Sequence, residues 1–261
     1  MKQNPSPMVE HSRPHRRLPE RTPPGRRYPL EIGTLYIPEK LAPRRQLLVF
    51  FHGGKYAPEL AGAKNRMAVI SVQAGSISEA YGQAFENPAR FRKLVAEAES
   101  KSGVHFGRLN LGGFSAGCGA IRQLLRSPEI YRRTNAVLCI DGIHTGYTNG
   151  TPGPLDSDID NGNLEIWVKL AKDAIAGRKR FVVTHSEIFP GTFASTTETA
   201  DSILRQVGLT RRPVMKRGPM GTQQLSEARA GRFLLIGYAG NSAPDHVDQL
   251  NSLPDYLAWL R

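Results

Sequence analysis

Ser115 stands in a pattern that could make it a nucleophile. It is the central residue of 113–117, whose sequence Gly-Phe-Ser-Ala-Gly fits the pattern G-x-S-x-G. Residues 108–111 alternate in polarity and predict a strand, and the apolar spacing after Ser115 predicts a helix that stops at Pro128. Such a sharp turn needs small flanking residues, and the start of the helix directs backbone N–H groups toward charge developing at the serine. A plain glycine turn between a strand and a helix is the alternative interpretation.

A serine hydroxyl needs a base to take its proton and a third group to orient that base. His246 is the predicted base, because it ends the polar stretch 241–246, which we expect to be a loop after the last strand. Asp141 and Glu187 are the candidates for the orienting carboxylate. We favour Asp141, since it follows an apolar strand directly and a strand end would hold it rigidly. Glu187 remains the alternative.

The elements that must position these residues alternate along the chain. Apolar runs predict strands, and segments with helical spacing or helix caps predict helices. One or two edge strands are expected over 28–37, and residues 74–86 read as irregular. The other predicted strands are 47–51, 67–72, 136–140, 181–184 and 233–236, and the other predicted helices are 88–103, 164–176, 196–207 and the C-terminal segments.

This alternation predicts an α/β fold with a mostly parallel sheet and helices on both faces. In such a sheet, functional side chains gather at the carboxyl ends of the strands. The reactive residue types fall at those ends: His52, Ser115, Asp141, His144, His185, Glu187 and His246.

The net charge of +12 raises the question of nucleic-acid binding. Residues 1–27 hold seven basic residues, two acidic residues and six prolines, which predicts a disordered, solvated tail. The other basic pairs are scattered, and no aromatic residues interleave with them as a stacking surface requires. We therefore expect no specific nucleic-acid partner, and a single domain over 28–261. Residues 145–163, rich in Gly, Pro, Asp and Asn, predict a small lid or cap on it.

The remaining composition points to a protein of the cytoplasm. No apolar run reaches the ~20 residues that a membrane span needs, and the N-terminus lacks the apolar core of a secretory signal. Cys118 and Cys139 lie among apolar residues and are expected to be buried free thiols. The alternating aspartates 156, 158 and 160 suggest a calcium loop, but Asn161 and Trp167 stand where that loop needs Gly and Glu. No metal and no cofactor are therefore expected.

Over residues 28–261 the chain resembles the α/β-hydrolase superfamily. The residues that carry this resemblance are the Gly-Phe-Ser-Ala-Gly turn, the sequence His52-Gly53-Gly54 after an early strand, and the order serine, acid, histidine. Lys55 departs from it, because esterases and lipases of this type have a third glycine there. The resemblance implies oxyanion donors at the backbone of Ala116 and of Gly54 or Lys55. It places the acid most often at the later position, near Glu187, although some members have it after the earlier strand.

The function that these residues predict is serine hydrolysis. The expected substrate is a small carboxylic ester, with thioesters and amides as further candidates, cleaved through an acyl-enzyme on Ser115. His52, Gly53, His144 and His185 are expected to line the substrate pocket, with the ring of His52 also bracing the loop beside the oxyanion hole. The alternative is a catalytically silent α/β-hydrolase domain that binds a ligand or a partner through the same pocket.

Overall fold

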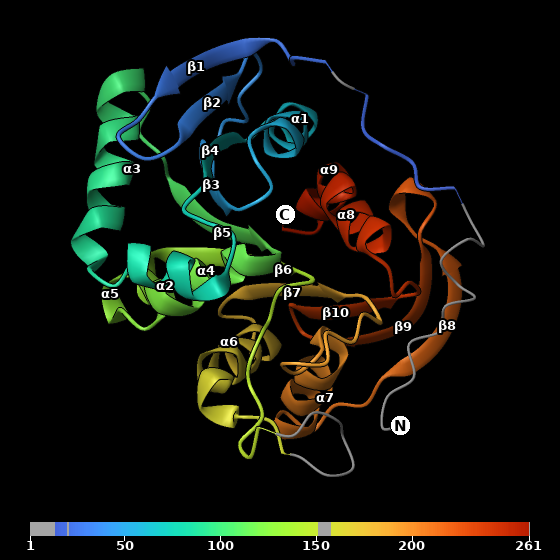
Figure 1. Cartoon of the computed structure of the whole chain (residues 1–261). Coiled ribbons are helices and arrows are strands. Elements are labelled where there is room, and N and C mark those ends of the chain that lie inside the picture. Colours follow the sequence, from blue (N-terminus) through green and yellow to red (C-terminus); the bar gives the residue numbers. More distant parts are fainter. Residues whose placement is uncertain (1–13, 20, 151–157, 261) are drawn as a thin grey trace. The chain divides into compact units, whose positions relative to one another are not determined.

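A computed structural model describes residues 14–19, 21–150 and 158–260 of the chain (Figure 1). The chain divides into two compact units. One comprises Leu18–Leu138 and Leu253–Arg261 and carries Ser115, and we call it the nucleophile unit. The other comprises Met1–Arg17 and Cys139–Ser252 and carries His246, and we call it the histidine unit. Strand β6, Thr134–Ile140, runs through the division.

The sheet of the nucleophile unit has parallel central strands. In it β3, Gln46–Phe51, pairs in parallel with β4, Ala68–Val72, and with β5, Arg108–Phe114. The outer strands β1, Gly25–Pro29, and β2, Thr34–Pro38, add to β4 antiparallel. After their first residue, β3 and β4 are apolar or small and buried throughout, as expected of strands covered on both faces.

Helices cover both faces of this sheet. Helix α1, Tyr56–Asn65, lies on one face, and α3, Pro88–Ser102, lies on the other (Figure 1). Asn87 caps α3 through the Ala89 N–H, and Gly103 ends it with a φ of 67°, as the sequence predicted. The other helices of this unit are α2, Ser78–Ala84; α4, Cys118–Leu125; α5, Pro128–Arg133; and α9, Leu253–Tyr256. The prediction of irregular structure over 74–86 is therefore wrong where α2 forms.

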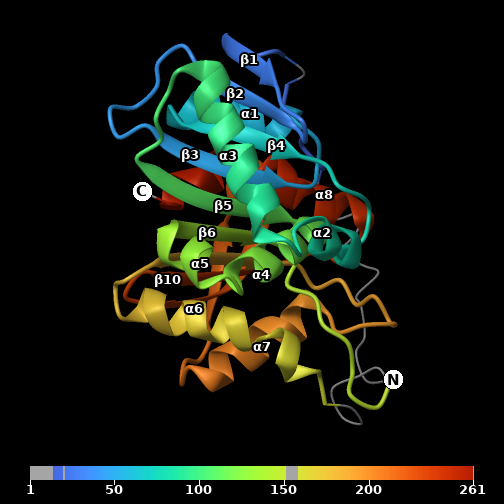
Figure 2. The same cartoon turned by 90° about the vertical axis from the view of Figure 1, so that its left-hand side faces the viewer.

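The histidine unit also builds its core on parallel strands. In it β7, Arg180–His185, pairs in parallel with β10, Phe233–Tyr238. Helices α6, Glu165–Ile175, and α7, Thr196–Gln206, pack side by side on this sheet (Figure 2). The sequence did not predict β8, Arg212–Arg217, and β9, Gln223–Ala230, which continue the sheet antiparallel to β10.

Each unit has its own apolar core. Phe51, Phe85 and Phe91 meet edge to face in the nucleophile unit. In the histidine unit Trp167 stacks on Phe181, which in turn contacts Phe233. Cys118 and Cys139 are buried free thiols, as predicted. The predicted fold class, an α/β fold with mostly parallel strands and helices on both faces, is confirmed.

Two segments were predicted to lie outside the core, a tail over 1–27 and a lid over 145–163. Strand β1 begins at Gly25, before the predicted domain boundary at residue 28. Residues 1–13 of the predicted tail, and 151–157 of the predicted lid, lie outside the described residues. The two ends of the predicted lid are joined by an antiparallel bridge between Tyr147 and Ile159. No helix among the described residues is both long enough and apolar enough to cross a membrane.

Candidate active site

Ser115 lies in a strained turn between β5 and α4. Its φ is +49°, in the left-handed region that residues with a side chain seldom adopt. The turn is a single 3-10 turn, Ser115–Gly117, that leads directly into α4. A Cβ at Gly117 would stand 2.0 Å from the backbone oxygen of Phe51, and one at Gly113 would stand 2.9 Å from the Cys118 nitrogen. The two glycines are therefore required by close backbone packing, as the pattern predicted.

The loop after β3 lies beside this turn. His52, Gly53 and Gly54 have φ angles of 71°, 88° and 72°, which bring three left-handed residues into succession. The ring of His52 stacks on Phe114, the residue before Ser115, with 5.9 Å between ring centres. Its Nδ1 is 3.1 Å from the Tyr81 hydroxyl and 3.2 Å from the Gln73 side-chain nitrogen. His52 therefore braces the loop against the nucleophile turn, within one unit.

The residues of this loop that are proposed as oxyanion donors are accessible to solvent. Gly54 and Lys55 are both exposed, and a Cβ on Gly54 would meet no atom within 4 Å. The Gly54 N–H donates to the side-chain oxygen of Gln73 at 3.3 Å. Because Gln73 is exposed, it can be displaced by a stronger acceptor such as an oxyanion. Ala116, at the start of the turn, is buried.

Asp141 directly follows β6 and is a buried carboxylate with four hydrogen bonds. Its φ is +45°, and it is 2% exposed. Oδ1 accepts from the Ser186 N–H at 2.9 Å and from the Thr196 hydroxyl at 2.6 Å. Oδ2 accepts from the Ser186 hydroxyl at 2.7 Å and lies 2.7 Å from Nδ1 of His246. The four donors hold the carboxylate in one orientation.

These contacts keep Asp141 ionised. Burial alone would raise the pKa of this carboxyl. The hydrogen bond and the charge of His246, followed by the bonds from Thr196 and Ser186, outweigh that effect and hold the pKa well below its usual range. The anion is therefore present at neutral pH to face the imidazole.

His246 lies on a helix, so the prediction of a loop over 241–246 is wrong from Ala243 onward. Helix α8, Ala243–Asn251, begins at a capping box in which Ser242 and Asp245 bond reciprocally. The side chain of His246 is 25% exposed. With Nδ1 protonated and donating to Asp141, the lone pair of the neutral ring is on Nε2, which is the nitrogen that can act as a base.

Glu187 and His144 contact residues other than Asp141 and His246 in the interactions described next. Glu187 is exposed, and its carboxylate accepts from the Gly240 N–H at 3.4 Å. His144 is half-buried and meets the ring of Phe193 edge-on, with 5.2 Å between centres. The carboxylate that His246 contacts through Nδ1 is thus Asp141.

His185 is buried, which does not support its predicted place in the substrate pocket. It is 4% exposed, its Nδ1 lies 3.0 Å from the Ser186 carbonyl oxygen, and its Nε2 lies 2.6 Å from the Arg211 guanidinium. Burial, followed by the charge of Arg211, lowers the pKa of His185 to about 4. The ring is therefore neutral and fixes the strand end next to Ser186.

Sequence reasoning missed Ser186 and Thr196 as partners of Asp141. Both lie at the ends of elements that the sequence did predict: Ser186 comes directly after β7, and Thr196 is the first residue of α7. The available signal was a hydroxyl residue after the strand and another at the start of the next helix, because a buried carboxylate needs hydrogen-bond donors of this kind.

One group among the described residues has the side chains and spacing of a metal site: His15, Asp245 and Asp248. Three of its four carboxylate oxygens already have hydrogen-bond donors: the Arg17 guanidinium contacts Asp248 Oδ1, His15 lies 2.8 Å from Asp248 Oδ2, and Ser242 donates twice to Asp245 Oδ2. We therefore interpret this group as an ion-pair cluster. Of the aspartates considered for calcium, Asp156 lies outside the described residues, and Asp160 accepts from the Gly162 N–H as a cap.

No family model matches the sequence, and no curated protein matches it either. Among solved structures, the chain is similar to an acetyl xylan esterase from Aspergillus awamori, with 15% identity, a TM-score of 0.49, and coverage of 87% of this chain and 92% of that one. An arylesterase matches with 13% identity, a TM-score of 0.47, and coverage of 97% and 90%. A carboxylesterase from Bacillus subtilis matches with 11% identity, a TM-score of 0.43, and coverage of 88% and 90%. At these identities the likeness concerns the fold alone.

The fold is of the α/β-hydrolase type, as predicted. This rests on the chain's own architecture: parallel core strands in both units, helices on both faces of the sheet in the nucleophile unit, and a serine at a strained strand-to-helix turn.

Proposed function

We propose that this chain is a serine hydrolase that cleaves small carboxylic esters through an acyl-enzyme on Ser115. The observation that carries the proposal is the contact between His246 Nδ1 and the buried carboxylate of Asp141, at 2.7 Å. A carboxylate held by four donors and facing an imidazole is the arrangement that fixes the tautomer of a general base. The strained turn at Ser115, with its flanking glycines, supplies the matching nucleophile.

In the first half of the reaction, Nε2 of His246 takes the proton of the Ser115 hydroxyl as Oγ attacks the ester carbonyl carbon. The carbonyl oxygen becomes an oxyanion, and the imidazolium is stabilised by Asp141. The tetrahedral intermediate then collapses, the bond to the alcohol oxygen breaks, and Nε2 gives its proton to the leaving alcohol. Ser115 is left as an acyl ester.

In the second half, water replaces the alcohol. Nε2 removes a proton from the water as its oxygen attacks the acyl carbon, and Ser115 leaves with that proton to release the carboxylic acid. The proposed oxyanion donors are the backbone N–H of Ala116 and the N–H of Gly54 or Lys55. The Gly54 N–H can bind the oxyanion only after it has left the side-chain oxygen of Gln73. The Lys55 N–H does not depend on that exchange.

The test is covalent labelling with a fluorophosphonate, followed by peptide mass spectrometry. We expect one phosphonyl adduct, on the peptide that contains Ser115. Ser115→Ala should remove it and abolish turnover with little change in melting temperature, because only a hydroxyl is lost. Ser76→Ala, at an exposed serine of the same unit, is the matched control and should label like the wild type. A folded wild-type protein that takes up no adduct would contradict the proposal and favour a ligand-binding module.

The acyl preference follows from a second measurement. A series of para-nitrophenyl esters of increasing acyl length, together with a thioester and an amide of one acyl group, would rank the substrates by kcat/KM. We expect esters to exceed amides, since the alcohol is the better leaving group. A higher kcat/KM for the amide would place the enzyme among amidases.

A further inference from the structure

Helix α8 carries the proposed base but has no apolar side chain among its fully buried positions. Those positions are Asp245, Asp248, Gln249 and Asn251, whereas Leu250 is half-buried and Val247 is 37% exposed. A helix is normally held to its neighbours by an apolar stripe. Polar contacts of these buried side chains therefore help to set the position of α8.

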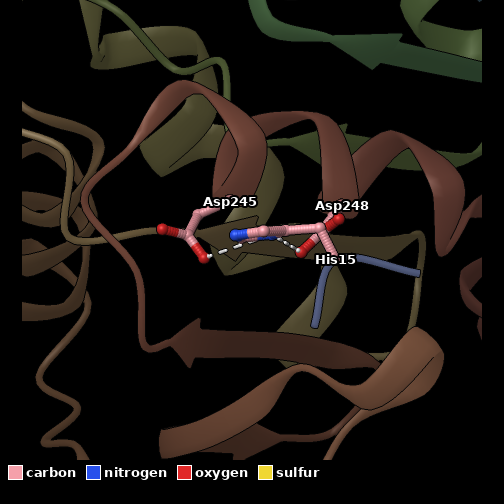
Figure 3. A group of neighbouring side chains, drawn as sticks. All are labelled: His15, Asp245 and Asp248. Atoms are coloured by element: carbon pink, nitrogen blue, oxygen red, sulfur yellow. Dashed lines mark hydrogen bonds and ion pairs between the residues drawn. The ribbon is translucent and has the colours of Figure 1, made fainter. Parts of the chain in front are cut away.

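The N-terminal segment Pro14–Arg17 supplies two of those contacts. Asp248 is 0% exposed, and His15 Nδ1 lies 2.8 Å from its Oδ2, while the Arg17 guanidinium contacts its Oδ1. His15 also lies 4.0 Å from Asp245 Oδ1 (Figure 3). A buried carboxylate is costly unless it is paired and hydrogen-bonded, so this segment stabilises α8 in the position seen.

The location of Asp248 links this contact to the chemistry. Asp245 and Asp248 are three residues apart and share one face of α8, and His246 projects from the same first turns toward Asp141. The helix is thus held by Asp141 at one residue and by His15 and Arg17 at another. Two such contacts fix its rotation about its own axis, which one contact alone leaves variable.

We propose that His15 and Arg17 are positioning residues for His246, and that the N-terminal segment is a working part of the active site. The part of this proposal that concerns catalysis rests on the proposed function. The part that concerns the position of α8 does not. The basic segment predicted to be solvated serves here as a clamp on the helix that carries the base.

The experiment compares Arg17→Ala and His15→Ala with Arg16→Ala in the full chain. Arg16 is an exposed neighbour whose removal takes away the same charge from the same segment. The first readout is amide hydrogen exchange over Val247–Asn251, which needs no activity. We expect exchange there to speed up about tenfold or more in Arg17→Ala and His15→Ala, with little change in Arg16→Ala and in β3 of every variant.

The second readout is turnover of an ester. A base that is misplaced but still present lowers transition-state stabilisation, so we expect kcat to fall about tenfold to a hundredfold while KM stays within about twofold. Arg17→Lys keeps a cation at the site and should recover part of kcat. If circular dichroism shows that Arg17→Ala is unfolded, the comparison uses Arg17→Lys and His15→Gln instead.

The two proposals fail in different ways. Unchanged exchange over α8 in folded Arg17→Ala and His15→Ala would overturn the clamp, whatever the enzyme does. Faster exchange with kcat equal to the wild type would overturn the positioning role. Effects of the same size in Arg16→Ala would mean that the loss of one positive charge explains them, and would also overturn the clamp. Faster exchange in Arg17→Ala and His15→Ala, together with a wild-type protein that hydrolyses no ester, would reject the proposed function and keep the clamp.

Discussion

Replacing Asp141 by Asn tests the base more directly than any other single substitution. The amide has the shape of the carboxylate, but one oxygen becomes an NH₂ group. Oδ1 can keep its bonds from the Ser186 N–H and the Thr196 hydroxyl. The NH₂ group then stands where Oδ2 faced the Ser186 hydroxyl and His246 Nδ1.

The two partners of Oδ2 respond differently. The Ser186 hydroxyl can rotate and accept from the new NH₂ group, which restores that bond. The imidazole can accept only by moving its proton from Nδ1 to Nε2, which removes the lone pair that serves as the base. We therefore expect kcat to fall by about 10⁴, the effect of the wrong tautomer in a serine triad, equivalent to ~5.4 kcal/mol of activation free energy.

The unfolding free energy should change less than the activation free energy does. One hydrogen bond to a charged acceptor disappears, which is worth about 1.5–3 kcal/mol of unfolding free energy. The loss should depend on pH, because the pKa of Asp141 is lower in the folded state than its unfolded value of about 3.9. The wild-type advantage is then fully present above about pH 4 and shrinks as the pH falls toward the folded pKa.

The assays are steady-state ester hydrolysis and urea unfolding between pH 2.5 and 7. Circular dichroism at pH 7 provides the control for folding. Turnover of Asp141→Asn within about tenfold of wild type, in a folded protein, would refute the assignment of Asp141 as the orienting acid. A stability difference that grows as the pH falls below 4 would refute the account of its ionisation.

Three further predictions follow from contacts described above. Glu187→Gln should keep most activity in the same assay, because its carboxylate faces Gly240; a 10⁴-fold loss would transfer the acid role to Glu187. Gly117→Ala should lower the urea-unfolding free energy by at least ~2 kcal/mol, since its Cβ would meet the Phe51 carbonyl, and wild-type stability would contradict this packing. The wild-type unfolding free energy should fall by ~3 kcal/mol as the pH drops from about 6.5 to about 4, because the unfolded chain protonates His185 and the fold does not; His185→Gln should lack this slope.

The sequence predicted the parts of the site that are encoded locally. The turn at Ser115 needs small residues within a few positions of the serine, so the pattern and the structure agree. The strand before Asp141 is apolar over its last five residues, 136–140, which placed this carboxylate at a strand end. These features depend on neighbours in the chain, and pattern reasoning can recover them.

The errors arose where distant contacts decide the structure. The stretch before His246 is polar and reads as a loop, although Ser242 and Asp245 have the spacing of a capping box, which was the overlooked signal. Strand β9 has no clear alternation, and its pairing with β10 makes it a strand. Arg17 looked like part of a solvated tail because Asp248, its partner, is 231 residues away.

Strand β8 has a consequence for how the purified protein behaves at high concentration. It stands at the end of the strand order in the histidine unit, where a sheet can accept a strand from another molecule. Its sequence, Arg-Pro-Val-Met-Lys-Arg, puts cations at both ends and a proline that cannot donate to a neighbouring strand. Two such strands would repel each other on approach. High salt screens that repulsion, so strand-to-strand association of this protein should be promoted by ionic strength and suppressed in dilute buffer.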